Sequence, residues 1–205
     1  MLVERRWQLL VKRVMDVFLS FIGLILLAPL FGFIALLVRL GSPGPIFYRW
    51  RVVGLNGRPF TGYKFRTMVS NADELKEKLL NGNEMRGPVF KMRDDPRVTG
   101  IGRLLRKYSL DELPQLWSVL KGDMSLVGPH PPLQSEVEKF EEWHWEKLSV
   151  KPGMTCIWQV DGKGRVNDFD DWVRMDLEYI QKWSLWLDAK ILFKTILFVL
   201  QGKNC

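Results

Sequence analysis

VFLSFIGLILLAPLFGFIALLV, residues 17–38, is an uncharged and strongly apolar run, and it decides the fold of this chain. A helix of about 20 apolar residues is long enough to cross the hydrocarbon core of a bilayer. Pro29 lies near the middle of the run, where a proline removes a backbone donor and favours a kink or a break. Basic residues flank the run on both sides, with Lys12 and Arg13 before it and Arg39 and Arg51 after it.

This flanking charge draws both ends of the run toward the cytoplasmic face, because positive charge is retained on that side of the membrane. A helix–break–helix that enters the membrane and returns satisfies the proline and the charges together. A kinked transmembrane span and a buried helix of a soluble protein remain open from the residues alone. Asp16, beside Lys12 and Arg13, is expected to form an interfacial ion pair with them.

The length of the chain indicates the number of its domains, and its charge indicates the class of its partner. A chain of 205 residues predicts one main domain, so we divide it into a membrane element over residues 1–40 and a single integrated unit over residues 41–205. The net charge of +7 indicates an anionic partner: lipid headgroups, nucleic acid or phosphorylated substrates. No aromatic–basic RNA-binding motif, Walker loop or GxGxxG occurs. The two cysteines, Cys156 and Cys205, fit a reducing compartment best.

The rest of the sequence predicts an α+β fold that is mostly helical. Aromatic and β-branched residues on both sides of Asn56-Gly57 predict a β-hairpin. The further expected elements, in chain order, are a helix over 70–83, a charged loop over 87–102, a helix from about residue 111, a stiff linker over 129–132, a helix over 136–148 and an amphipathic run over 169–200. The apolar stripe of that last run is consistent with a membrane-interface helix and equally with core packing.

The stretch RKYSLDELPQLW holds the most chemically suggestive residues. Ser109 and Glu112 have the spacing of a capping box, so helix capping alone would explain the acids. Pro114 favours a helix start at or near Asp111, because a proline is tolerated in the first turn. A carboxylate at that position, with Arg106 shortly before it, would lie where phosphate also binds well.

Several segments, in order, resemble the bacterial sugar transferases, also called monotopic phosphoglycosyl transferases. They are KRVMD (12–16), GSPGPIFYRWRVVG (41–54), YKFRTM (63–68), DDPRVTGIGRLLRKYSLDELPQLWSVLKGDMSLVGP (94–129), KPGMTCIWQVDG (151–162) and DLEYIQKWSLWLDAKILFKT (176–195). The resemblance covers nearly the whole chain and is nearest to exopolysaccharide-initiating members. It implies a re-entrant helix broken at Pro29 and a catalytic domain that faces the cytoplasm on the bacterial inner membrane.

The resemblance also implies a catalytic dyad, Asp111 and Glu112. Asp111 would attack the sugar-bearing phosphate of a nucleotide diphosphate sugar, with uridine as the expected nucleoside, and hold the phospho-sugar covalently until polyprenyl phosphate accepts it. Mg²⁺ is expected to bridge the diphosphate and Asp111, since two anionic reactants must meet. Arg106 is a candidate phosphate ligand. Further candidates for phosphate binding are Lys64, Arg66, Arg97 and His130.

Three residues depart from the family pattern. His130 stands where an arginine is common, which makes anion binding there sensitive to pH. Ala28 replaces a frequent serine before the membrane proline, which leaves Ser20 as the nearest hydroxyl for the broken backbone. Cys156 replaces a frequent glycine and is expected to be buried and inert. A non-catalytic membrane adaptor is the alternative function, and the tryptophan-rich helical surfaces also allow a homodimer.

Overall fold

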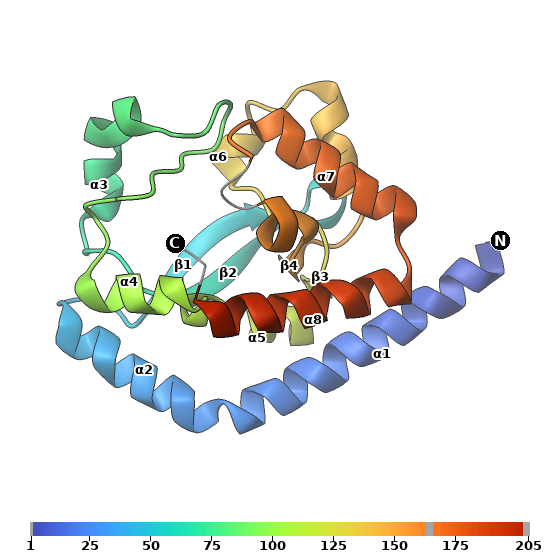
Figure 1. Ribbon diagram of the computed structural model, residues 1–205, viewed down its shortest axis with the longest axis horizontal. Coiled ribbons are helices and arrows are strands. Elements are labelled where there is room, and N and C mark those ends of the chain that lie inside the picture. The colour runs from blue at the N-terminus through green and yellow to red at the C-terminus, as the bar shows by residue number, and fades with distance from the viewer. Residues whose placement is uncertain (1, 163–165, 203–205) are drawn as a thin grey trace.

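The computed structural model describes residues 2–162 and 166–202, so Cys205 lies outside the described residues. The main helices and strands follow one another as α1 (Leu2–Leu26), α2 (Ala28–Gly41), β1 (Phe47–Val53), β2 (Pro59–Phe65), α3 (Ala72–Lys76), α4 (Gly100–Lys107), α5 (Gln115–Lys121), β3 (Ser125–Val127), α6 (Gln134–Val137), β4 (Gly153–Thr155), α7 (Phe169–Lys182) and α8 (Leu185–Gln201). The predicted α+β class with a helical majority is confirmed. Figure 1 shows α1 and α2 forming a wide V beneath a body built from the other elements.

The break in the apolar run lies where the sequence predicts it. Leu27 separates α1 from α2, and Pro29 is the second residue of α2, where its missing N–H is not needed. The two helices are bent by 62°. Within the described residues no single helix is long and apolar enough to cross a membrane, whereas this bent pair together meets the requirement of length and composition. Re-entry from one face therefore stays a prediction.

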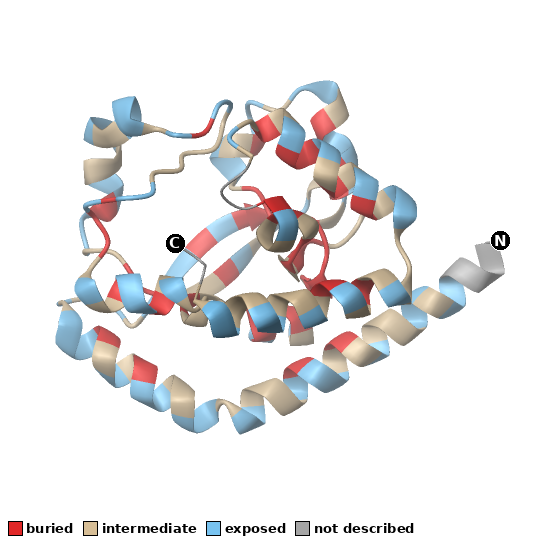
Figure 2. Ribbon diagram, in the orientation of Figure 1, coloured by how far each residue is buried: buried red, intermediate tan, exposed pale blue. Residues whose placement is uncertain are grey.

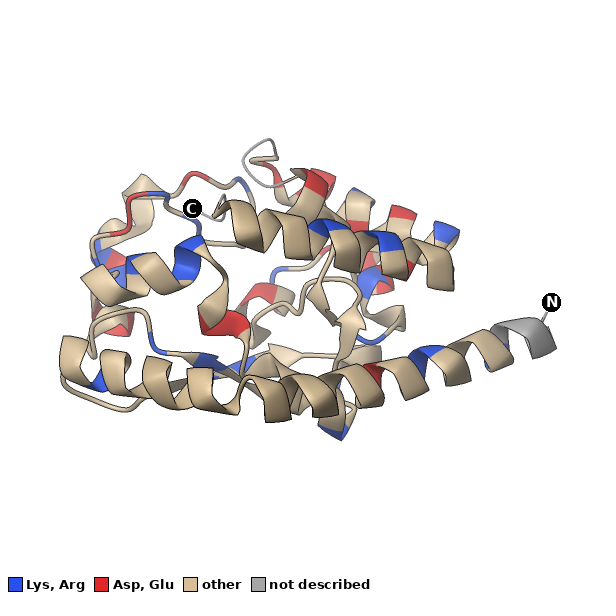
Figure 3. Cartoon of the chain, turned by 60° about the horizontal axis from the view of Figure 1, so that its bottom comes forward, with Lys and Arg blue, Asp and Glu red and all other residues tan. Residues whose placement is uncertain are grey.

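Charge is sparse along the V, which Figure 3 shows as a long stretch of uncharged ribbon. Large apolar side chains of both helices are exposed, including Phe18, Phe21, Phe33 and Leu40. The prediction that Ser20 serves the broken backbone is wrong, because its buried hydroxyl has no hydrogen-bond partner among the described residues. The Leu27 amide instead donates to the Gly23 carbonyl at 2.9 Å, so the ladder continues to the break.

The predicted hairpin is confirmed. Strands β1 and β2 pair antiparallel from Phe47 opposite Phe65 to Val53 opposite Pro59. Asn56 and Gly57 both have positive φ angles, 54° and 76°, as the central residues of a type I′ turn require. The amide of Arg58 donates to the Leu55 carbonyl at 3.2 Å and closes this turn.

A second, parallel pair of strands was not predicted. Strands β3 and β4 lie side by side with Ser125 opposite Gly153. A Cβ on Gly153 would stand 2.0 Å from the Gly128 amide nitrogen, so only glycine allows the two backbones this close. The predicted linker 129–132 then runs beside the hairpin, where the Pro132 carbonyl accepts from the Val53 amide at 3.0 Å.

Several predicted helices are shorter than expected. The helix expected over 70–83 is split into α3 and a 3-10 segment, Glu77–Gly82, and the one over 136–148 into α6 and a 3-10 segment, Glu142–Ser149. The amphipathic run over 169–200 breaks at Ser184, whose hydroxyl caps α8 by accepting from the Leu187 amide. The loop over 87–102 ends early, because Thr99 caps α4, a helix start that was not predicted.

Polar contacts tie the first helix to the last part of the chain. Lys12 donates to Asp188 and to the Val127 carbonyl, and Arg13 donates to the last carbonyls of α5. Asp16 accepts from the Leu126 amide at 3.0 Å, so the predicted pairing of Asp16 with Lys12 and Arg13 is wrong. Burial explains this, since the carboxylate enters the protein body and meets a backbone donor there. Figure 2 shows buried residues concentrated in this central region.

Candidate active site

The acidic pair lies in a short turn between two helices. Leu110–Glu112 forms one 3-10 turn, and Ser109 before it adopts the left-handed conformation with φ 51°, which reverses the chain after α4. The α-helix begins only at Gln115, after Pro114. The predicted helix start at Asp111 is therefore wrong by about one turn. Proline explains the delay, because its fixed backbone ends the tight turn and opens α5.

Asp111 is a buried carboxyl group, with 8% of its surface exposed. Burial, together with the negative charge of Glu112, raises its pKa from 3.8 to about 6. The positive charges of Lys64 and Arg106 act in the opposite direction on this pKa. The structure therefore brings Lys64 and Arg106 close to the predicted dyad.

The carboxylate of Glu112 is held by donors on both oxygens. Lys64 Nζ donates to Oε1 at 2.8 Å, and Gln159 Nε2 donates to Oε2 at 3.3 Å. Lys64 also lies over the Trp50 ring, 4.3 Å from its centre, which fixes the direction of the ammonium group. The ion pair and the second donor fix the orientation of the Glu112 carboxylate.

Gln159 was not predicted as a site residue. Its Oε1 accepts from the Cys156 amide at 3.0 Å, so the side chain connects the segment after β4 to Glu112. The only signal in the sequence is a polar residue between Trp158 and Val160, in an otherwise apolar stretch. Cys156 itself is buried as predicted, and burial raises the pKa of its thiol.

Arg106 is positioned by the segment that follows β2. Its Nε donates to the Thr67 hydroxyl at 3.0 Å. Helix α4 approaches this segment closely, because a Cβ on Gly102 would lie 2.0 Å from the Thr67 carbonyl oxygen. The Thr99 amide donates to the same carbonyl at 3.0 Å. Thr67 thereby sets the position of α4, and with it that of Arg106, beside Asp111.

Arg66 and Arg97 are predicted phosphate ligands whose side chains are buried in other contacts. Arg66 donates to the carbonyls of Ser42, Pro43 and Pro45 and to the Ser42 hydroxyl, which holds the loop after α2. Arg97 forms a bidentate pair with Asp95 and also donates to a carbonyl of α3. These contacts are those of structural arginines, and phosphate binding by either one stays a prediction.

His130 lies in an aromatic environment. Its ring centre is 6.2 Å from that of Trp50 and 5.4 Å from that of Trp172. Trp50 also contacts Lys64, so His130 is connected to the acidic pair through one indole ring. Binding of phosphate by His130 stays a prediction.

The carboxylate of Asp111 suits a cation such as Mg²⁺ that also binds oxygens of a substrate. The described part of the chain contains no group of three or more metal-ligating side chains. Mg²⁺ commonly uses one or two carboxylates and completes its shell with phosphate oxygens and water. Asp111 would supply this carboxylate. Both oxygens of its neighbour Glu112 already accept hydrogen bonds from Lys64 and Gln159.

Comparison with known proteins gives a consistent picture. Residues 7–202 match the family described as bacterial sugar transferase. The chain is 45% identical to galactosyl transferase CpsE of Streptococcus agalactiae over 194 residues, which are 95% of this chain and 43% of that protein. It is 45% identical to undecaprenyl-phosphate galactose phosphotransferase of Salmonella typhimurium over 203 residues, 97% of this chain and 42% of that protein.

A shorter relative is covered more completely. The chain is 42% identical to exopolysaccharide production protein ExoY of Sinorhizobium fredii over 189 residues, which are 90% of this chain and 83% of that protein. The chain therefore spans less than half the length of the first two relatives and most of the third.

Proposed function

Because the chain belongs to the family of bacterial sugar transferases, we propose that it transfers a sugar-1-phosphate from a UDP-sugar to undecaprenyl phosphate. This would be the first membrane step in assembling an exopolysaccharide or a related glycan. The observation that carries the proposal is the buried Asp111 beside Glu112, with Lys64 and Arg106 as the adjacent cations. The names of two of the relatives described above, one of which mentions undecaprenyl phosphate and the other exopolysaccharide, support the choice of acceptor and pathway.

The reaction proceeds in two displacements at phosphorus. An oxygen of ionised Asp111 attacks the phosphate that bears the sugar, a new P–O bond forms, and the bond to the nucleoside monophosphate breaks. The phosphate of the polyprenyl acceptor then attacks the same phosphorus. The bond to Asp111 breaks, which restores the carboxylate and gives a diphosphate-linked lipid sugar.

The surrounding residues have separate tasks in this scheme. Arg106 is suited to hold a phosphate oxygen by bidentate contacts. Lys64 and Gln159 orient Glu112, whose negative charge acts on Asp111. Asp111 would hold Mg²⁺ together with the diphosphate, and the ion would supply neutralisation of negative charge as the reactants approach.

The proposed attachment to the membrane is based on the exposed apolar surfaces of α1, α2 and α8. The V of α1 and α2 exposes large apolar side chains, and α8 carries a second exposed stripe that contains Trp186, Phe193, Ile196 and Leu200. We assign the V to a re-entrant element and α8 to the membrane interface, with the rest of the chain in the cytoplasm. A homodimer remains a prediction without further support.

The function is tested by following each displacement separately. Purified protein in detergent is given a UDP-sugar labelled in the sugar, first without acceptor and then with undecaprenyl phosphate. The native chain should release UMP and retain label on the protein in the first stage, and pass label to lipid in the second. Asp111→Asn should do neither.

Asp171→Asn is a matched control, because Asp171 is an exposed acid whose ion pair within the described part of the chain is with the exposed Arg174. Native-rate transfer by Asp111→Asn would disprove the nucleophile. Absence of transfer by the native chain across a panel of UDP-glucose, UDP-galactose and UDP-acetamido sugars would favour the non-catalytic adaptor instead.

A further inference from the structure

The hairpin has two faces that serve different parts of the molecule. Cross-strand partners point to the same face, and successive residues alternate between faces. Lys64 therefore marks the inner face, which meets Glu112. Arg49, opposite Tyr63, and Arg51, opposite Thr61, lie on the outer face. No step of the proposed reaction uses that outer face.

A pocket of about 480 Å³ opens at the end of the hairpin nearest to α2. Its lining residues are Pro45, Ile46, Phe47, Tyr48, Arg49 and Tyr63. Phe47 and Tyr48 keep 43% and 44% of their surfaces exposed, so the pocket is accessible. Its walls combine apolar surface with a guanidinium group and two phenols.

The arginines of the outer face have free donors. Within the described ranges, 2–162 and 166–202, no carboxylate pairs with Arg49 or Arg51, and both side chains are exposed. By contrast, Arg66 and Arg97 are committed to carbonyls and a carboxylate, as described above. An arginine with free donors, such as Arg49 opposite Tyr63, is suited to bind phosphate oxygens.

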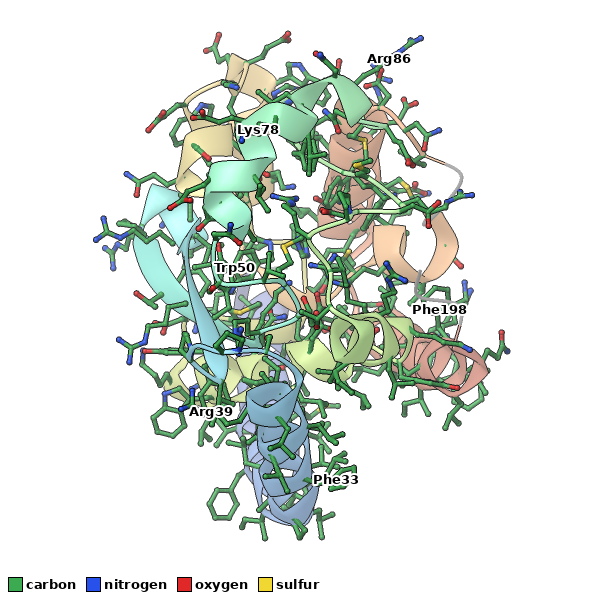
Figure 4. The ribbon with its side chains drawn as sticks, turned by 90° about the vertical axis from the view of Figure 1, so that its left-hand side faces the viewer. Phe33, Arg39, Trp50, Lys78, Arg86 and Phe198 are labelled. Atoms are coloured by element: carbon green, nitrogen blue, oxygen red, sulfur yellow. The ribbon has the colours of Figure 1, made fainter. Side chains whose placement is uncertain are left out.

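The position of the pocket relative to α2 indicates where its phosphate comes from. Helix α2 exposes Phe33, Leu36 and Leu40 and ends at Gly41, only a short loop before the pocket. Figure 4 shows Phe33 on the part of α2 that projects below the body and Arg39 at the level where the helix meets the hairpin. If α2 enters the membrane, the pocket stands at the height of the lipid headgroups.

We propose that this pocket binds the phosphate of an anionic bilayer lipid of the phosphatidylglycerol type. Arg49 holds the phosphate, Arg51 supplies a second charge one step along the same face, and Phe47 covers the start of the acyl chains. The inference rests on the membrane seating given under Proposed function. The polyprenyl acceptor is a different ligand, because its phosphate must reach Asp111, whereas Arg49 and Tyr63 line the pocket from the face of the hairpin opposite to Lys64.

The test uses the full chain in nanodiscs made from phosphatidylglycerol and phosphatidylcholine. Lipids that remain bound after gentle release are identified by native mass spectrometry. The native chain should retain phosphatidylglycerol in excess over its share of the bilayer. Each of Arg49→Gln and Arg51→Gln should reduce this enrichment about fivefold, the effect of one basic residue at an anionic surface.

Arg58→Gln is the matched control, since Arg58 is an exposed arginine in the turn at the far end of the hairpin. Equal losses in Arg58→Gln and Arg49→Gln would show a general charge effect and overturn the proposal. Unchanged enrichment in Arg49→Gln would overturn it as well. Displacement of the retained lipid by equimolar undecaprenyl phosphate would assign the pocket to the acceptor, and displacement by millimolar inorganic phosphate would assign it to free anions.

Transfer activity in detergent without phosphatidylglycerol separates this inference from the proposed function. Active protein that shows no enrichment contradicts the lipid pocket alone. Inactive protein that keeps the enrichment contradicts the transferase function alone.

Discussion

The most informative single residue is Asp111, because its burial has opposite effects on reactivity and on stability. A buried carboxylate without full solvation is a better nucleophile than one in water, but its ionised form is costly to keep in the folded state. Lys64 and Arg106 offset part of that cost. The raised pKa of Asp111 makes both its reactivity and its contribution to stability depend on pH.

The first prediction concerns the pH dependence of the first displacement. Asp111 must be ionised to attack, and its pKa is raised to about 6. The rate of UMP release in the absence of acceptor should therefore fall about tenfold for each pH unit below about 6 and level off above about 7. Single-turnover measurements across this range provide the check, and a rate that stays constant down to pH 4 would contradict the assignment.

The second prediction concerns stability. Since the folded state raises the pKa of Asp111, folding favours its protonated form, and the stabilising effect present at low pH is lost as the pH rises through about 6. Asp111→Asn should therefore raise the free energy of unfolding at pH 7.5, by at most about 3 kcal/mol. At pH 4 the variant and the native chain should differ little. Thermal unfolding in detergent at both pH values tests this sign.

At the residue scale the sequence predicts which acids form the candidate site, but not which side chains hold them in place. Lys64 and Arg106, named from the sequence as phosphate ligands, lie close enough to Asp111 to act on its pKa, and phosphate binding by them stays a prediction. Gln159 could not be predicted, because its contact with Glu112 joins positions 47 residues apart in the sequence. Arg66 has the same charge as Lys64, and only the structure shows that its donors hold the loop after α2.

At the scale of elements, the contact between α4 and the segment after β2 determines the position of Arg106. The hydroxyl of Thr67 accepts from Arg106 Nε, while its carbonyl accepts from Thr99. Gly102 allows α4 to come this close. The orientation of Arg106 thus depends on a side chain 39 residues away in the sequence.

Thr67→Val should weaken this orientation without changing the size of the side chain. A hydrogen bond to a charged group contributes roughly 1.5 kcal/mol or more, so kcat/KM for the UDP-sugar should fall about tenfold. Thr67→Ser should restore most of the activity, because it restores the hydroxyl. Thr61→Val, on the exposed outer face of β2, should leave kcat/KM unchanged. A loss of similar size in Thr61→Val would point to general destabilisation.

Element boundaries were predicted less well than element types. The hairpin was found because its turn residues have a distinctive backbone requirement. The helix expected from Asp111 starts at Gln115 instead, since the tight turn at Ser109 and Pro114 overrides the capping pattern. Strands β3 and β4 are three residues each and pair across a long separation, so no local pattern could reveal them.

At the scale of the whole molecule, Asp188 connects the two ends of the chain. One carboxylate accepts from Lys12 of α1, from the Tyr179 hydroxyl and from the Trp183 indole. Burial raises the pKa of the Tyr179 phenol, so the hydroxyl keeps its proton and donates it in a hydrogen bond to Asp188. Through Asp188, α1 and α8 are held to the same body.

Asp188→Asn should therefore destabilise the fold, because it leaves Lys12 partly buried without its counter-ion. We expect a loss of about 3 kcal/mol, the usual range when one partner of a buried pair is removed. Chemical unfolding in detergent micelles measures this loss. Glu178→Gln is the matched control, since its pair with Lys182 is well exposed and should contribute less than about 1 kcal/mol. Equal effects in the two variants would contradict the connecting role of Asp188.

The attachment of the V at both ends has a mechanical consequence. Lys12 and Arg13 fasten α1 near the point where the apolar run begins, and Arg66 fastens the loop that follows α2. With the V as a re-entrant element, the protein would sit at a fixed depth in the bilayer. The carboxylate of Asp111 would then stay at one height above the lipid. In a thicker or thinner bilayer the whole molecule would tilt or rise, whereas the distance between the turn that carries Asp111 and the V would stay the same.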